Sequence, residues 1–247
     1  MKARGIVLVA GLMALAGPAS ARVLKTRSTA SETWAPLSAF VIGSGFEYHR
    51  DSEQAEYDFP ILIEYNVSER LKLIVEPDFS RIVGRTPDVR SVSGLGDLET
   101  SVEYEFLRER RYRPALSMQA LVKWPTASDP DLGTAGRDYS IGLIASKDLV
   151  LVDVDANVRY TFTGDREERD TVELSVSAEW HLNHRLDVLA EAVTTIPIGR
   201  GGRTESEGTL GLGWRVNSNL KIEQGAIYRS DHTWQFVFAW EWSFGGD

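Results

Sequence analysis

Residues 233–244 read TWQFVFAWEWSF, and this stretch decides the fold. Half of its residues are aromatic, and all of the rings stand at even positions: Trp234, Phe236, Phe238, Trp240, Trp242 and Phe244. Side chains of a β-strand alternate between two faces, so one face of a strand here would be an unbroken row of rings. Such a row fits either the core of a soluble protein or the hydrocarbon of a membrane, and the rest of the chain has to distinguish the two.

The same alternation runs through the remainder of the chain. In residues 171–182, TVELSVSAEWHL, apolar side chains fill the even positions and polar side chains fill the odd ones. A helix would spread the two sets around its axis, whereas a strand separates them. The pattern predicts an all-β, antiparallel single domain of about 12 strands, at residues 37–49, 55–67, 70–83, 95–107, 114–125, 137–147, 150–163, 170–182, 185–197, 206–216, 219–230 and 232–244.

The N-terminus has the features of a cleaved signal peptide. A positive start at Lys2 and Arg4 precedes a short apolar run and the small residues Ala19 to Ala21. The run is too short to cross a bilayer, which takes roughly 20 apolar residues. We therefore predict a signal peptide at 1–21, a periplasmic N-terminal extension at 22–36 and a barrel domain at 37–247.

Composition excludes several classes of function. The chain has no cysteine, so disulfides and cysteine-ligated metals are ruled out. Its net charge of −9 offers no basic stripe to meet phosphates, and we expect no nucleic acid partner. We also expect no cofactor.

The connections between predicted strands favour a membrane barrel. Those after the second, sixth, eighth and tenth strands are short, whereas those after the first, third, fifth, seventh and ninth are long and polar. Bacterial outer-membrane barrels combine short periplasmic turns with long outer loops, and carry aromatic girdles at both interfaces. Rings here cluster near strand ends on the apolar face, such as Tyr139 and Trp234 at one rim and Trp180 and Trp214 at the other.

These features together predict a transmembrane β-barrel in the outer membrane of a Gram-negative cell. Its partners would be outer-membrane lipid, the barrel-assembly machinery and a small-molecule solute. Phe244 resembles the terminal aromatic residue by which that machinery recognises a barrel, although Gly245 to Asp247 follow it. A soluble periplasmic sandwich or barrel would also alternate, and it stays the alternative fold.

The polar face is charged in the middle of the strands. Charges facing lipid are costly, so these side chains should face a water-filled lumen and tune which solutes pass. An excess of acids predicts a preference for cations or neutral solutes, and a carboxylate solute would need Lys123, Arg159, Arg215 or Arg229. A second possibility is an ion-paired network that merely fills a narrow barrel. The predicted lumen-lining residues are Glu64, Glu76, Asp78, Glu103, Glu105, Lys123, Asp153, Asp155, Arg159, Glu179, Glu191, Arg215, Glu223 and Arg229.

Catalytic and metal-binding patterns are weak. A Ser-His hydrolase needs a histidine beside a nucleophilic serine, and of the four histidines only His181 is expected to face inward. The acids Asp129, Asp131 and Asp138 lack the regular spacing of a calcium-binding EF-hand loop. We therefore expect neither an enzyme nor a metal site.

Two segments resemble a known family. The residues concerned are Gly94, Gly96, Asp97, Lys123, Pro125, Thr126, Leu132, Gly133, Thr134, Gly136 and Asp138. Their pattern is similar to that of a family of outer-membrane transporters named for the meta-cleavage pathway of phenol degradation. The resemblance implies a porin-like transporter for small organic compounds, often aromatic. In such a channel the loop at 126–137 is a candidate gate, with Lys123 and Asp138 at its hinges.

The sequence thus predicts a channel for passive passage of small organic solutes. Two alternatives stay open: an outer-membrane barrel with a structural or adhesive role that transports nothing, and a soluble periplasmic β-barrel binding module.

Overall fold

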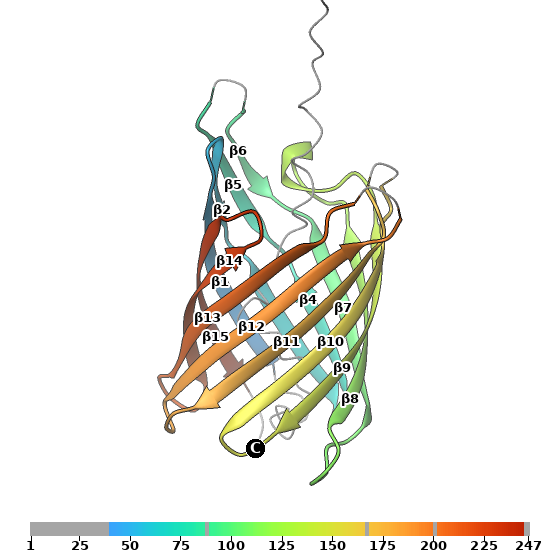
Figure 1. The fold of residues 1–247 in the computed structure, drawn as a ribbon, viewed down its shortest axis with the longest axis vertical. Helices are drawn as coiled ribbons and strands as arrows, with labels where there is room; N and C mark the ends of the chain where they lie inside the picture. The colour runs from blue at the N-terminus through green and yellow to red at the C-terminus, as the bar shows by residue number, and fades with distance from the viewer. Residues whose placement is uncertain (1–39, 87–88, 166–167, 200–201, 245–247) are drawn as a thin grey trace, which may run out of the picture.

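The protein, studied as a computed structural model, forms a closed antiparallel barrel of 12 strands (Figure 1). The structure describes residues 40–86, 89–165, 168–199 and 202–244. The predicted signal peptide, the N-terminal extension and the start of the first predicted strand lie outside the described residues. No helix in the described ranges has the length and hydropathy to span a membrane.

The barrel wall is built from fifteen strand segments in chain order. They are β1 (Phe40–Arg50), β2 (Gln54–Asp58), β3 (Ile61–Ser68), β4 (Leu71–Glu76), β5 (Phe79–Gly84), β6 (Val92–Leu95), β7 (Leu98–Leu107), β8 (Ala115–Trp124), β9 (Asp138–Asp148), β10 (Val152–Phe162), β11 (Thr171–His181), β12 (Leu186–Pro197), β13 (Glu205–Arg215), β14 (Leu220–Arg229) and β15 (Trp234–Phe244). A single 3-10 turn, η2 (Pro130–Leu132), interrupts the connection from β8 to β9.

The strand with the row of aromatic rings, β15, closes the barrel. β15 pairs with β14 on one side and with β1 on the other, in a register that runs from Phe40 opposite Phe244 to His49 opposite Gln235. Closure between β15 and β1 pairs both edges of the main wall, which a barrel in a bilayer requires because lipid cannot hydrogen-bond to backbone groups, and the short segment β6 pairs with β5 alone.

The predicted strands at 55–67 and 70–83 are each split in two at one level of the wall, and the predicted strand at 95–107 continues a segment that begins at Val92. The breaks fall at Phe59–Pro60, at Pro77–Asp78 and at Gly96–Asp97, so β2 and β3, β4 and β5, and β6 and β7 are halves of single barrel strands. Proline has no N–H for the ladder, and the halves stay registered through neighbouring bonds such as Ile61 N to Pro77 O. In Figure 1 the upper halves β2, β5 and β6 form a wall of their own above the level of the breaks.

The distribution of polarity is inverted relative to a soluble protein. Most of the large apolar residues on the strands are exposed, including Phe236, Phe238 and Leu210, whereas the buried positions are mainly charged or hydroxylated. Glu103 and Asp187, for example, are 0% exposed. Because the exposed and the buried sets alternate along the same strands, the apolar face is the outside of the barrel and the polar face is the inside.

Connection lengths agree with the prediction at all but one place. Short turns at 69–70, 149–151, 182–185 and 216–219 lie at the end of the barrel where Phe40 pairs with Phe244, and longer connections such as 125–137 lie at the opposite end (Figure 1). The prediction of a long loop after the first strand was wrong. β1 and β2 pair up to Arg50 and Ala55, because the polar stretch there extends the ladder and leaves only residues 51–53 as the turn.

Candidate functional site

The interior polar face holds the candidate site. Nine of the predicted lumen-lining residues are buried there: Glu64, Glu76, Glu103, Glu105, Lys123, Asp153, Asp155, Glu179 and Glu223. The remaining five are half-buried: Asp78, Arg159, Glu191, Arg215 and Arg229. All of those that lie on strands share the face opposite the exposed apolar residues. Their role as the lining of a solute path stays a prediction.

Each predicted interior cation is engaged by acids. Lys123 lies 2.6 Å from Asp138, and Arg159 lies 2.7 Å from Glu173. The remaining two cations contact acids at longer distances. Arg229 contacts Glu207 at 3.5 Å and donates to Gln235 Oε1 at 2.6 Å, and Arg215 contacts the carboxylate of Asp187 at 3.2 Å. The positive charges are thus neutralised within the wall.

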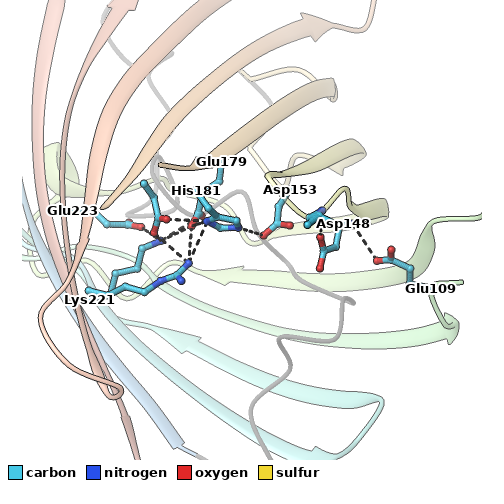
Figure 2. A network of polar contacts seen from close by, with 10 residues as sticks. Glu109, Asp148, Asp153, Glu179, His181, Lys221 and Glu223 are labelled. Atoms are coloured by element: carbon cyan, nitrogen blue, oxygen red, sulfur yellow. Dashed lines mark hydrogen bonds and ion pairs between the residues drawn. The ribbon is translucent and has the colours of Figure 1, made fainter. Parts of the chain in front are cut away.

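A dense ion-pair cluster occupies the end of the barrel that carries the short turns (Figure 2). His181 bridges two acids, with Nδ1 2.8 Å from Asp187 and Nε2 3.1 Å from Asp153. Lys221 lies 3.2 Å from Glu179 and 2.7 Å from Glu223. Five consecutive strands, β10 to β14, contribute to this cluster, so it ties that part of the wall together.

The same cluster contains a possible set of metal ligands. One ligand atom from each of Glu179, His181 and Asp187 lies within 4.8 Å of the others. Arg215 and Lys221 contact the two carboxylates of this set. Because those cations already compensate the carboxylates, the arrangement fits an ion-pair network better than a metal centre.

The family-like motif forms one structural unit around Asp97. This residue stands at the break between β6 and β7, and its Oδ1 accepts hydrogen bonds from the backbone N–H groups of Thr126 and Ala127 at 3.0 and 3.1 Å. Its Oδ2 accepts from the backbone N–H and the hydroxyl of Thr134 at 2.8 and 3.0 Å. A single carboxylate thereby fixes both ends of the 125–137 connection.

The glycines of the motif stand where the chain packs too closely for a side chain. A Cβ on Gly133 would lie 2.4 Å from Ala127 Cβ, one on Gly94 would lie 2.0 Å from Ser128 Oγ, and one on Gly136 would lie 2.3 Å from Gly164 C. Pro125 follows directly on the end of β8, where the ladder needs no further donor. The motif thus positions a loop, and it brings no free charged group to the lumen.

The connection predicted as a gate is anchored at both ends. The predicted hinges Lys123 and Asp138 are joined to each other by an ion pair, and Asp138 Oδ1 also accepts from Gly164 N at 2.9 Å. At its outer side Arg90 binds Asp129 at 2.5 Å and Asp131 at 2.9 Å. These contacts favour a fixed loop. They also separate Asp129 and Asp131 from Asp138, so the three acids considered for calcium do not gather.

The sequence pattern did not identify two of the interior charges. Glu47 and Glu207 face the interior with the predicted set, and Glu47 is 2% exposed. The alternation of faces along β1 could have identified Glu47, because the odd-numbered residues of that strand face inward. The small residues Gly43 and Gly45 at those positions weakened the contrast between the two faces.

The fold of this chain, and not its sequence, is similar to known proteins. No protein-family model and no curated protein matches the sequence. The fold is similar to the COG4313 outer membrane channel from Pseudomonas putida F1, with a TM-score of 0.69 at 12% identity over 85% of this chain and 96% of that chain. It is also similar to the KdgM porin in complex with disordered oligogalacturonate, with a TM-score of 0.59 at 11% identity over 82% of this chain and 99% of that chain. For the NanC porin the TM-score is 0.59 at 10% identity, over 81% and 98% of the two chains. This chain therefore has the fold of outer-membrane channels and porins.

Proposed function

We propose that this protein is an outer-membrane channel for small organic solutes. The observation that carries the proposal is the inverted barrel, with an apolar outer face and a charged inner face in one closed sheet. A soluble binding barrel would expose that apolar face to water, whereas a bilayer accommodates it. The fold shared with channels and porins supports the same conclusion.

The charges of the interior limit the class of solute. Lys123, Arg159, Arg215 and Arg229 all contact acids of the wall, so a carboxylate solute would have to break existing ion pairs. We therefore restrict the proposal to neutral and cationic solutes. It does not include anions such as the oligogalacturonate in complex with the KdgM porin. Preference for aromatic compounds, which the family resemblance implies, stays a prediction of the sequence.

Single-channel recording tests the proposal. The refolded protein would be inserted in a planar bilayer under a KCl gradient, and so would a variant with Glu103→Gln and Glu105→Gln. We expect discrete conductance steps with a cation preference, and a smaller preference in the variant because two interior carboxylates are removed. Folded, heat-modifiable protein that gives no steps would contradict the proposal and favour the structural or adhesive barrel.

A solute panel then addresses the aromatic preference. Proteoliposome swelling would be compared for neutral aromatic, cationic aromatic, benzoate-like and sugar solutes of similar mass. Faster entry of neutral or cationic aromatics than of the sugar supports the preference, and equal rates would remove it.

A further inference from the structure

Glu191 lies in an unusual electrostatic position within the barrel. It is half-buried on the inner face of β12, and none of the described residues forms a hydrogen bond or an ion pair with its carboxylate. Within the described part of the chain, the charged groups that act on its carboxylate are the acids Glu207, Glu173 and Asp155. Arg159 and Arg229, which face the same interior, contact Glu173 and Glu207.

The neighbours of Glu191 on the adjacent strands carry side-chain oxygens, which can accept hydrogen bonds. The register places Asp155 of β10 beside Ser177 of β11, Ser177 beside Glu191, and Glu191 beside Thr209 of β13. Directly opposed residues on one face of a sheet have Cβ atoms roughly 5 Å apart. Carboxylate, hydroxyl, carboxylate and hydroxyl therefore follow one another across four adjacent strands, and the row contains no basic side chain.

A buried hydroxyl in this row has no partner. Thr209 is only 3% exposed, and its Oγ1 makes no hydrogen bond. Leaving a buried hydroxyl unsatisfied costs about 1–3 kcal/mol, so such a group in a native structure requires an explanation. Since Thr209 is the cross-strand neighbour of Glu191, a ligand seated on the carboxylate would be within reach of this hydroxyl.

The side-chain oxygens of this row indicate the chemistry of the ligand. The unpaired carboxylate of Glu191 and the unpaired hydroxyl of Thr209 together favour a cation. Among the described residues, the single group of three acidic or histidine ligand atoms close enough to hold a metal ion is the His181 cluster, which lies elsewhere on the wall. A primary ammonium, with three hydrogens that it can donate to oxygens spaced along a wall, fits the row better than a directly coordinated metal.

An apolar surface adjoins the row. Ile227 of β14 is the register partner of Thr209, and Leu189 precedes Glu191 by two residues on the same inner face. Together with Val237 these two residues form an interior apolar cluster in an otherwise polar wall. The hydrocarbon body of an organic amine at Glu191 would therefore lie beside this buried apolar cluster.

We propose that Glu191 and Thr209, with Asp155 and Ser177 beside them, form a binding site for the primary ammonium group of a small organic amine on the solute path. This assignment rests on the proposed function for its biological meaning, but binding itself can be measured without transport.

The test is calorimetric titration of the folded protein in detergent micelles with n-butylammonium chloride. We expect binding that weakens at least tenfold in Glu191→Gln and several-fold in Thr209→Val. Glu223→Gln is the matched control, because that carboxylate is paired with Lys221, and it should bind within about twofold of the natural chain. Butyltrimethylammonium, which has no N–H donor, should bind more weakly than butylammonium.

Several outcomes overturn the site. They are an absence of binding to the natural chain, equal affinity in Glu191→Gln, equal losses in Glu191→Gln and Glu223→Gln, or tighter Mg²⁺ binding that competes with the amine. Conductance recording separates the two proposals. Glu191-dependent binding without conductance steps would refute the channel and leave the amine site supported. Conductance steps without amine binding would refute the amine site and support the channel.

Discussion

The hydroxyl of Thr134 donates a hydrogen bond to Asp97 Oδ2 at 3.0 Å, and the backbone N–H of Thr134 donates to the same oxygen at 2.8 Å. The two residues are 37 positions apart in the chain. Asp97 is 7% exposed, so these bonds are shielded from competing water. The contact converts a long outer connection into a fixed part of the barrel rim.

Replacing Asp97 by Ala should release this connection. Hydrogen bonds to a charged group contribute about 1.5–3 kcal/mol each. The backbone N–H groups of Ala127 and Thr134 would lose their acceptor, whereas Thr126 N–H keeps its contact with Trp124 O. We expect the amides of Ala127 and Thr134 to exchange with solvent at least a hundredfold faster, while the amides of β10 to β13 keep their protection. Glu205→Ala, which removes an exposed acid at the start of β13, is the control. Unchanged exchange in Asp97→Ala would show that the loop is held by other contacts.

Gly133→Ala should destabilise the same unit by overpacking. The added Cβ would lie 2.6 Å from Asp97 Oδ1 and 2.4 Å from Ala127 Cβ, and neither neighbour is the end of a long flexible side chain. Overpacking of this kind costs about 1–3 kcal/mol. Gly208→Ala is the control, since its Cβ would meet its nearest atom at 3.9 Å. Limited proteolysis of the 125–137 connection measures the difference, and equal cleavage rates for the two variants would refute it.

The ion pair of Lys123 and Asp138 should show strong coupling in a double-mutant cycle. Both side chains are buried, and removal of one partner leaves an unpaired buried charge at a cost of about 3–5 kcal/mol. We expect Lys123→Met to be more destabilising than the double change with Asp138→Asn. Unfolding in denaturant from lipid vesicles gives the free energies. Additive effects of the two changes would mean that the pair contributes little.

The outer face should be sensitive to charge in proportion to depth. Leu210 lies at the middle of β13 and is 69% exposed, whereas Trp214 lies near the end of the same strand. Arginine at the midplane of a bilayer costs about 2–4 kcal/mol, and about 0–1 kcal/mol near an interface. Leu210→Arg should therefore lower the free energy of folding into vesicles more than Trp214→Arg does. Equal effects would contradict the assignment of this face to lipid.

The outer loop offers a pH-dependent contact. The pKa of Asp129 is lowered by the backbone N–H of Asp131 and, next, by the guanidinium of Arg90. A lowered pKa in the folded state means that this contribution to stability is present at neutral pH and is lost as the pH falls through the folded value. Arg90→Ala should move the pKa of Asp129 up towards its ordinary value, which carboxyl NMR titration measures. An unchanged pKa would assign the whole shift to the backbone bond.

The sequence by itself determined the strands and their two faces. Period two is a local property of an extended chain, so the alternation at 171–182 and 233–244 predicted both where strands run and which side chains face inward. The predicted twelve strands and the barrel class are confirmed. Glu64, Glu103 and Asp155 lie on the inner face for the same reason.

Tertiary structure decided which inward residues meet. Asp97 lies at the break between β6 and β7 and Thr134 lies in the 125–137 connection, so they meet only once β7 pairs with β8. The isolation of Glu191 among acids likewise depends on the register of β10 to β13. Alternation fixes the face of a side chain because it acts between adjacent residues, whereas register fixes its neighbours through bonds between distant segments.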